Sequence, residues 1–472
     1  MKNIKYNFRF RNWRILLFSI AVLSAASCKK FVQVPLPNNQ VVTSAVFADS
    51  ADAVSSVLGM YIQIMGSYGT FNFGNGGITL WTGLSADELY STTANSDLNE
   101  FYTNAVSPVN NGTNNRSIWI FAYNLIYQAN ACIEGLAGNN GISTPLKNQL
   151  TGEATLVRDF YYFNLVNLYG EVPLVTSTDY KANAVLTRIP ADSIYNWIVK
   201  DLINAQGLLT AAYPSSGQLR PNLYAAKALL AKVYLYQQQW GLAASTASTV
   251  ISSGLYSLDP ALNSVFLINS SEAIWQLSPV ISGLETTEGY DFVPSSLTIK
   301  PKYVIGNYLL NAFEAGDQRR VNWLDSNVVN NAAYYYPYKY KLGLDGSSTP
   351  QEGYMVFRLG EQYLIRAEAE AETGDSSDAI SDLNMIRNRA GLENFSAAVQ
   401  GPLLASIQHE RQVELFCEWG NRWYDLKRTG SVNTVLTAEK PGVWPSDGHA
   451  ALFPIPDAEM LLDVNLTQNM GY

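Results

Sequence analysis

Apolar residues recur at every third or fourth position along several long stretches of the chain, a spacing that places them on one face of an α-helix. The helices predicted in this way span residues 118–136, 146–169, 194–209, 225–250, 362–372, 377–389 and 403–418. The fourth is interrupted at Gln239-Trp240-Gly241 and is therefore predicted to be a helical pair. Gly170 follows the second helix, and glycine commonly ends a helix because it tolerates a left-handed backbone. The pattern predicts a mostly helical (mostly α) protein.

Two of the predicted helix pairs look like copies of one another. A shift of 135 positions superposes Leu229 on Leu364, Leu230 on Ile365, Ala244 on Ala379 and Ile251 on Ile386. Each copy turns near a glycine, Gly241 in the first and Gly374 in the second. Helix–turn–helix units with alanine at close contacts resemble tetratricopeptide repeats. We therefore expect a tetratricopeptide-like helix-pair scaffold, with generic helical hairpins as the alternative.

Two segments lack this helical pattern. Residues 71–113 contain several glycines, Trp81 and a run rich in Asn, Ser and Thr, and residues 260–355 are rich in Ser, Gly, Asn and Tyr. Long irregular segments in a compact protein are usually functional loops. The predicted organisation is an N-terminal helical half over about 28–255, a loop-rich middle over about 256–355 and a C-terminal half over about 356–472.

The first 27 residues have the order of a secretory signal peptide. Basic residues without any acid precede the apolar run 15–22, and small residues at 24–27 precede Cys28. The apolar run is too short for a transmembrane helix, which needs roughly 20 residues. A cysteine at this position favours lipidation, although Ala25 stands where a lipobox usually has leucine. We expect a lipid anchor on Cys28, with ordinary cleavage nearby as the alternative.

The mature chain is acidic. The formal net charge is −9, and removal of the signal peptide takes away five positive charges, which leaves −14. An acidic, aromatic-rich chain has no electrostatic reason to bind nucleic acid. Cys132 continues the apolar stripe of its predicted helix and is expected to be a buried free thiol. A disulfide between Cys132 and Cys417 is left open, because sequence alone does not fix the pairing.

The densest group of charged and aromatic residues lies at 403–430. Its members are Glu410, Arg411, Glu414, Glu418, Arg422, Trp423, Asp425 and Arg428. Together they resemble the C-terminal signature of the SusD/RagB family of nutrient-binding lipoproteins, named after SusD of the starch-utilisation system. The ending that starts at Phe453-Pro454-Ile455-Pro456 fits the same family, as do segments 170–174, 225–231 and 363–369. The resemblance covers nearly all of the mature chain, in order.

This resemblance implies a SusD-like helical fold and a place at the outer membrane, on the cell surface. It implies binding of oligosaccharides without hydrolysis and without a cofactor. It also implies a partner similar to SusC, a TonB-dependent transporter barrel that receives the ligand. Some relatives, in the manner of RagB, capture peptides, so peptide binding is the alternative within the same class.

The charged signature could also be catalytic. Glu410, Glu414 and Glu418 are four residues apart, on one face of the predicted helix. Paired carboxylates can perform acid–base chemistry on a glycosidic bond. However, arginines surround these acids, and nearby cations lower a pKa that a general acid needs raised. Structural ion pairs are therefore the preferred interpretation and no enzyme is expected; a glycan-active enzyme and a purely structural scaffold are the alternatives.

The sequence lacks the residues that a metal site or a phosphate-binding loop requires. His409 and His449 are the two histidines of the chain, and His409, within a charged helix face, is expected to be a surface or hydrogen-bonding residue. The glycines at 74–77 lack the lysine and the preceding strand of a phosphate loop. The sequence therefore predicts neither a metal site nor a bound cofactor.

Ligand contacts are expected in the two loop-rich regions. Sugars have apolar C–H faces edged by hydroxyl groups, so their sites combine an aromatic platform with amide and carboxylate groups. The candidate residues are Trp81, Asp87, Tyr90 and Asn95 in the first region, and Tyr290 and Trp323 in the second. For any single aromatic residue, packing in the core is the more common role. The hypothesis is a pocket shared between the two regions.

Overall fold

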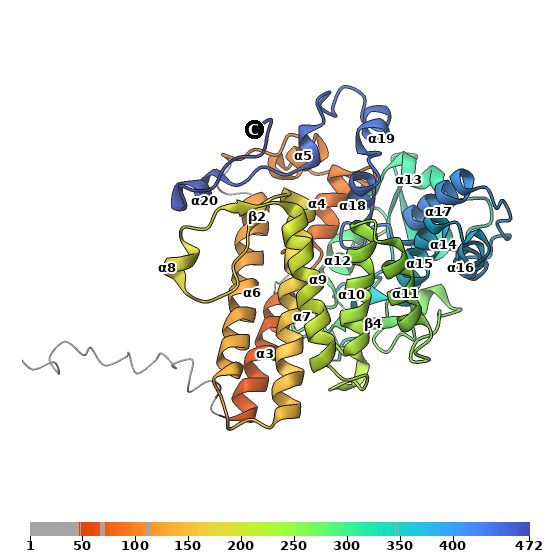
Figure 1. Cartoon of the computed structure of the whole chain (residues 1–472). Coiled ribbons are helices and arrows are strands. Elements are labelled where there is room, and N and C mark those ends of the chain that lie inside the picture. The colour runs from red at the N-terminus through yellow and green to blue at the C-terminus, as the bar shows by residue number, and fades with distance from the viewer. Residues whose placement is uncertain (1–46, 48, 67–70, 110–113, 345, 348) are drawn as a thin grey trace, which may run out of the picture.

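Helices make up most of the protein, as the apolar pattern predicts (Figure 1). The computed structural model describes residues 47, 49–66, 71–109, 114–344, 346–347 and 349–472. Cys28, the predicted lipidation site, lies outside these residues. Within the described part of the chain, no helix combines the length and the apolar character that crossing a membrane requires.

Four long helices stand side by side in the N-terminal half (Figure 1). They are α3 (Ser50–Met65), α6 (Asn114–Ala137), α7 (Thr144–Tyr169) and α9 (Ala191–Leu208). α7 packs against the other three, so its residues from Gln149 onward are almost all buried. It ends at Gly170, whose φ of 72° is left-handed, as expected for a helix stop. The three predicted helices of this half are confirmed, and α3 was not predicted.

Helical hairpins form the other side of the molecule. They are built from α10 (Leu223–Tyr236) with α11 (Trp240–Ile251), and α15 (Leu359–Thr373) with α16 (Ser376–Arg389), followed by α17 (Gln400–Glu414). α11 packs against α15, which joins the two pairs that the sequence shift identified. A second, smaller apolar core lies between α15, α16 and α17, centred on Leu364, Leu383 and Ile407.

Shorter elements cover the ends of these helices. The helices are α4 (Gly77–Ser85), α5 (Ser96–Tyr102), α8 (Tyr180–Asn183), α12 (Thr287–Phe292), α13 (Asn307–Ala312), α14 (Gln318–Asn322), α18 (Asn421–Arg428), α19 (Val432–Glu439) and α20 (Asp457–Leu462). Single 3₁₀ turns lie at Ser216–Gln218, Leu262–Ser264 and His449–Ala451. α4, α5, α13 and α19 gather at the top of the view in Figure 1.

The strands pair two by two, all antiparallel. The pairs are β1 (Leu89–Ser91) with β5 (Tyr303–Ile305), β2 (Val172–Pro173) with β3 (Arg188–Ile189), β4 (Ala273–Leu277) with β8 (Tyr354–Arg358), and β6 (Leu324–Val329) with β7 (Ala332–Pro337). In the first pair Tyr90 lies opposite Val304. This pair joins the two loop-rich regions of the sequence.

The structure corrects two predictions. Residues 71–113 are more ordered than expected, because they contain α4, β1 and α5. Every residue of α4 is buried, so it lacks the polar face that would have identified it. The helix predicted over 403–418 ends at Glu414; Cys417 and Trp419 then take positive φ values of 49° and 48°. Cys132 and Cys417 are both buried free thiols, so the open disulfide is not formed.

Candidate functional site

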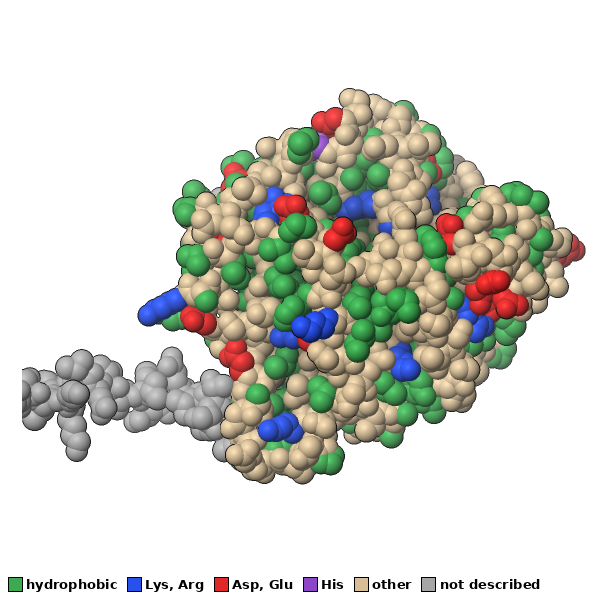
Figure 2. Space-filling model, in the orientation of Figure 1, with side chains coloured by type: hydrophobic (Ala, Val, Ile, Leu, Met, Phe, Trp, Pro, Cys, Tyr) green, Lys and Arg blue, Asp and Glu red, His purple; other side chains and the backbone are tan. Residues whose placement is uncertain are grey.

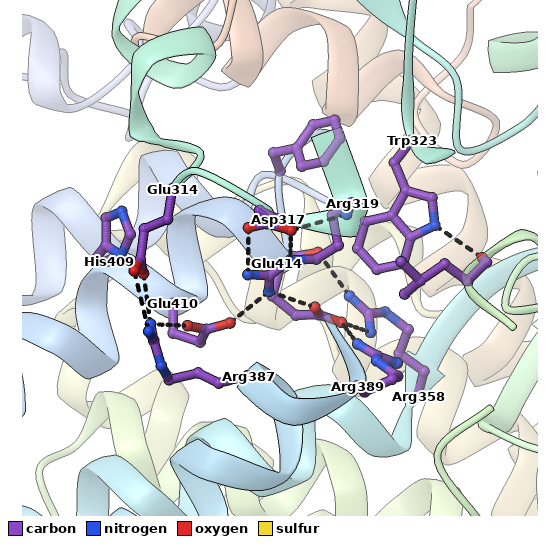
Figure 3. Close-up of polar contacts among 12 residues, drawn as sticks. Glu314, Asp317, Arg319, Trp323, Arg358, Arg387, Arg389, His409, Glu410 and Glu414 are labelled. Carbon is purple, nitrogen blue, oxygen red and sulfur yellow. Dashed lines mark hydrogen bonds and ion pairs between the residues drawn. The ribbon is translucent and has the colours of Figure 1, made fainter. Parts of the chain in front are cut away.

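A buried network of ion pairs occupies the centre of the C-terminal signature (Figure 3). The carboxylate of Glu414, at the end of α17, accepts hydrogen bonds from three guanidinium groups. Arg319 donates at 2.9 Å and Arg358 at 2.5 Å, and Arg389 is the third donor. Arg319, Arg358 and Glu414 are each at most 1 % exposed. One carboxylate therefore joins α14, β8, α16 and α17.

The other two acids of the signature extend this network. Glu410 accepts from Arg319 at 2.6 Å and from Arg387 at 3.3 Å. Glu418 lies beyond the end of α17 and binds Arg358 and Lys339, whose ammonium group donates to it at 2.5 Å. The three carboxylates are thus paired structurally, although Glu418 does not share the helix that was predicted for it.

A second buried cluster fixes α18 against α15 and α17. Arg411 donates to Asp425 at 2.8 Å and lies 3.8 Å from Glu368. Arg428 donates to Asp425 at 2.7 Å and to Glu368 at 2.6 Å. Trp423, two residues before Asp425 on α18, is fully buried and stacks on Phe453. The signature residues therefore lock α18 onto the helical scaffold.

The pKa values show what these carboxyl groups can do. Burial raises the pKa of Glu414, but Arg389, Arg358 and Arg319 outweigh burial and hold it well below 4.5. Burial is likewise outweighed at Glu418, where Arg358 and Lys339 lower the pKa, and at Asp425, where Arg411 and Arg428 lower it to about 2. Glu410 differs, because burial prevails and raises its pKa. Ionised, paired carboxylates at Glu414 and Glu418 agree with the structural interpretation.

A solvent-open cleft of about 300 Å³ lies beside this network, and we call it the tyrosine cleft. Tyr90, Tyr102 and Tyr308 line it together with Asp87, Asn307, Glu439 and Lys440. Tyr102 and Tyr308 are 37 % and 45 % exposed, and Tyr90 is half-buried. Burial, then the neighbouring Tyr334 and Tyr102, raises the pKa of Tyr90, which places Tyr334 close to the same wall.

Backbone pairing brings the two loop-rich regions together at this cleft. Beyond the β1–β5 pair, the N–H of Gly306 donates to the carbonyl of Glu88 at 2.7 Å. A side chain at Gly306 would not fit, because a Cβ atom there would lie 2.7 Å from the carbonyl oxygen of Asp87. The close approach explains the glycine, and it places Asn307 and Tyr308 opposite Asp87 and Tyr90.

Lys440 closes the cleft from the C-terminal side. Its ammonium group donates to the carbonyl oxygens of Leu84 (2.6 Å), Ser85 (3.0 Å) and Tyr102 (2.9 Å). These carbonyls lie at the C-terminal ends of α4 and α5, where a cation is favoured by the helix dipole. Burial lowers the pKa of Lys440 to about 7, with Asp87 and Glu439 acting in the opposite direction.

Two carboxyl groups face each other in the cleft. Arg422 binds both oxygens of Asp87, at 2.5 and 2.9 Å, and outweighs burial, so that the pKa of Asp87 is lowered. Asp87 and Glu439 also share a hydrogen bond, and burial followed by the Asp87 charge raises the pKa of Glu439 to about 9. Glu439 therefore carries a proton at neutral pH, and the pair can both donate and accept hydrogen bonds.

The candidate ligand residues lie in different surroundings. Asp87 and Tyr90 lie in the tyrosine cleft, and the exposed Asn95 caps the N-terminus of α5, whose last residue, Tyr102, lines it. Tyr290 is half-buried on α12, with Lys302 over its ring at 5.8 Å. Trp81 and Trp323 are 1 % and 0 % exposed.

Trp81 and Trp323 pack in the core, which is the more common role of a single aromatic residue. Trp81 stacks on Phe101, and the indole N–H of Trp323 donates to the carbonyl of Leu262 at 2.9 Å. Neither ring has an exposed face that a sugar could contact. Tyr102, Tyr308 and Glu439 were missed, because their place in the cleft depends on β1–β5 pairing and on Lys440, which no local motif reveals.

One group of potential metal ligands occurs among the described residues: Glu314, His409 and Glu410, whose ligand atoms come within 4.8 Å of one another. Arg387 donates to Glu314 at 2.6 Å and also to Glu410, so its charge takes the place of a cation (Figure 3). His409 Nε2 lies 2.7 Å from the carbonyl of Ala312, which confirms the hydrogen-bonding role expected of it.

Comparison with known proteins assigns both halves of the chain to one family. The model of the SusD family matches residues 319–472, and a model described as starch-binding and associating with the outer membrane matches residues 59–235. SusD-like protein P25 of Formosa agariphila is 25 % identical over 540 residues, covering 97 % of this chain and 99 % of that protein.

Two further comparisons agree. The starch-binding protein SusD of Bacteroides thetaiotaomicron is 34 % identical over 128 residues, which are 26 % of this chain and 22 % of that protein. The crystal structure of a SusD superfamily protein from Bacteroides vulgatus covers 90 % of this chain and 100 % of its own, with a TM-score of 0.77 at 20 % identity. The SusD family model spans the buried ion network, and the model described as starch-binding and associating with the outer membrane spans Asp87 and Tyr90. The chain therefore belongs to the SusD/RagB family.

Proposed function

We propose that this protein captures a neutral oligosaccharide in the tyrosine cleft, without cleaving it, and delivers it to a TonB-dependent transporter similar to SusC. The observation that carries the proposal is the composition of the cleft. Three partly exposed tyrosines surround a volume of about 300 Å³, beside an amide and a carboxyl pair. Aromatic faces bind the apolar C–H faces of sugars, and the polar groups bind the hydroxyls.

The carboxyl pair suits a ligand without charge. Asp87 is already neutralised by Arg422, and Glu439 holds a proton, so the wall offers hydrogen bonds and no unpaired anion. A ligand hydroxyl group can donate to the oxygen of Glu439 that has no hydrogen-bond partner among the described residues. The exposed carboxamide of Asn307 adds one donor and one acceptor. Because the carboxyl pair carries no unpaired charge, hydrogen-bond complementarity is the basis of selection.

The expected location of the protein at the outer membrane supports delivery of the ligand to a transporter. The model that matches residues 59–235 is described as associating with the outer membrane, and residues 1–27, which precede Cys28, have the pattern of a signal peptide. A binding protein held at that surface has no route inward of its own. We propose that lipid on Cys28 holds it there; Cys28→Ser is then expected to move the protein from the membrane fraction to the soluble fraction, and absence of label after growth with radioactive palmitate would refute the anchor.

Binding at the cleft is tested by titrating maltoheptaose, laminariheptaose and cellohexaose into the purified protein by calorimetry. Tyr308→Ala is expected to weaken binding at least tenfold, equal to about 1.4 kcal/mol. Tyr308→Phe keeps the ring and loses only the hydroxyl that donates to Ala438 at 2.9 Å, so it is expected to bind nearly as wild type does.

Tyr127→Ala is the matched control, because Tyr127 is 49 % exposed on α6 and lies outside the cleft. Its affinity is expected to be unchanged. Equal affinity of Tyr308→Ala and wild type would move the site elsewhere. Release of shorter sugars from any titrated ligand would overturn the absence of catalysis.

The transporter partner is tested by purification from detergent-solubilised membranes of the native organism. A tagged copy of this protein is expected to bring a barrel of the TonB-dependent class with it in a near-equal molar amount. Recovery of the tagged protein alone, from membranes in which that barrel is shown to be present, would contradict the proposal.

A further inference from the structure

A second cleft, larger than the first, lies on the helical-hairpin side of the molecule. It has a volume of about 420 Å³ and lies between α10, α15, α17 and α18. Figure 2 views the molecule from the side of α9, α10 and α11. Trp240 lines this cleft, and we call it the Trp240 cleft.

The ring of Tyr236 lines this cleft, whereas its hydroxyl is buried behind the wall. Tyr236 is 9 % exposed, and burial raises its pKa well above 10, so the hydroxyl stays neutral.

Two polar groups of the wall are available to a ligand. Among the described residues, Glu372 forms no ion pair and Gln408 forms no side-chain hydrogen bond, although both line the cleft. Arg428, which also lines the cleft, is already paired with Glu368 and Asp425. The cleft therefore offers one carboxylate, one amide and the indole of Trp240.

This set of groups selects against charged ligands. An anion would meet Glu372 and Glu368 while the only cation of the wall, Arg428, is already paired. A cation would satisfy Glu372 but leave the N–H donors of the Gln408 amide without acceptors. A neutral polyhydroxyl compound satisfies all of them, and its C–H faces match the indole of Trp240.

We propose that the Trp240 cleft is a second carbohydrate subsite, which takes a short segment of neutral oligosaccharide independently of the tyrosine cleft. The inference rests on the proposed function, because it assumes that the protein binds glycans. The two clefts are separate but share one structural element: near the start of α18, Arg422 binds Asp87 of the tyrosine cleft, and at its end Arg428 lines the Trp240 cleft. α18 has eight residues, a length of about 12 Å at 1.5 Å per residue.

Stoichiometry tests the proposal. Maltotriose, laminaritriose and cellotriose are titrated separately into the whole protein, with native mass spectrometry to count bound sugars and calorimetry to measure affinity. Wild type is expected to bind two molecules of at least one trisaccharide. Ala405→Trp, which fills the Trp240 cleft from an exposed position on α17, is expected to bind one. Asn307→Trp, which fills the tyrosine cleft from an exposed position, is also expected to bind one.

The controls separate this inference from the proposed function. Ala182→Trp places the same side chain on the exposed surface of α8, outside both clefts, and is expected to bind two. Glu372→Gln removes the unpaired carboxylate without changing its shape and is expected to weaken the site that remains in Asn307→Trp at least tenfold. Circular dichroism confirms that each variant is folded.

Each result has one meaning. One sugar per wild-type chain, lost in Asn307→Trp and kept in Ala405→Trp, would overturn the second subsite and leave the proposed function intact. A wild-type protein that binds none of the trisaccharides or of the longer sugars would overturn both. Two sugars in wild type and in Ala405→Trp would place the second site outside the Trp240 cleft.

Discussion

Arg411 is a buried charged residue that stabilises the fold through its ion pairs. It is 1 % exposed and binds Asp425, with Glu368 nearby. Arg411→Ala leaves these acids buried with one cation fewer, so we expect the free energy of unfolding to fall by about 3–5 kcal/mol. Thermal melting measures the change, and the folded fraction is expected to bind glycan as wild type does.

Arg320→Ala provides the matched comparison. Arg320 is an exposed arginine on α14, and its guanidinium group lies over the ring of Tyr335, at 5.5 Å. Its removal is expected to cost less than about 1 kcal/mol. If Arg411→Ala melted like wild type yet failed to bind glycan, the signature would be a ligand site and its structural role would be refuted.

Sequence alone predicts which residues of the signature form ion pairs, but not with whom. Glu414 stands among arginines in the chain, yet two of its partners, Arg319 and Arg358, come from more than fifty positions upstream. The same limit applies to the cleft. Asp87 and Tyr90 are identifiable from their region, whereas Glu439 reaches Asp87 only because α18 and α19 fold back over α4.

At the scale of elements, the amphipathic helices are the predictable part. α6, α9 and α16 each bury one face, and their apolar spacing places them within a few residues. α4 has no such spacing because all nine of its residues are buried, and α17 ends early because Glu418 must turn toward Lys339. Burial on every side and long-range pairing leave no periodic signal in the sequence.

The β1–β5 pair provides the prediction at this scale. Gly306→Ala places a methyl group 2.7 Å from the carbonyl oxygen of Asp87, so the strands must separate. We expect a loss of about 1–3 kcal/mol in the free energy of unfolding, together with a loss of glycan affinity of at least tenfold. Urea unfolding and calorimetry measure the two effects.

Gly207→Ala is the control for this substitution. Gly207 lies inside α9, where an added methyl group meets nothing within 4 Å. Alanine is the better helix former, so this variant is expected to gain up to about 1 kcal/mol and to bind glycan normally. Unchanged stability and affinity in Gly306→Ala would show that the register of β1–β5 does not set the cleft.

For the whole molecule, the buried carboxyl groups predict an unusual dependence of stability on pH. Burial raises the pKa of Glu88, Glu288 and Glu352 from 4.5 to about 8. Between these values the unfolded chain releases protons that the folded protein retains, so stability falls as pH rises. Glu414 and Asp425 act oppositely, because their lowered pKa values stabilise the folded state above about pH 4.5, and this contribution is lost toward pH 2.

Stability is therefore expected to be greatest near about pH 5, between these two limbs. Urea midpoints measured from pH 3 to pH 9 test this expectation. Glu88→Gln keeps an acceptor for the N–H of Cys417, which lies 3.0 Å from Glu88, and removes one proton-binding group. It is expected to flatten the alkaline limb. A midpoint that is constant from pH 5 to pH 8 in wild type would contradict the prediction.

The ammonium group of Lys440 also has a consequence for biosynthesis. A chain is synthesised from its N-terminus, so Leu84 and Tyr102 are made more than three hundred residues before the lysine that binds their carbonyls. Asn115 is likewise made long before Pro454, whose carbonyl it binds, and Tyr169 long before Asn469, which donates to its carbonyl. The walls of the tyrosine cleft are thus completed by a segment that is among the last to be synthesised. A molecule truncated before residue 440 would lack a finished cleft, so ligand binding distinguishes the longer polypeptide from such a fragment.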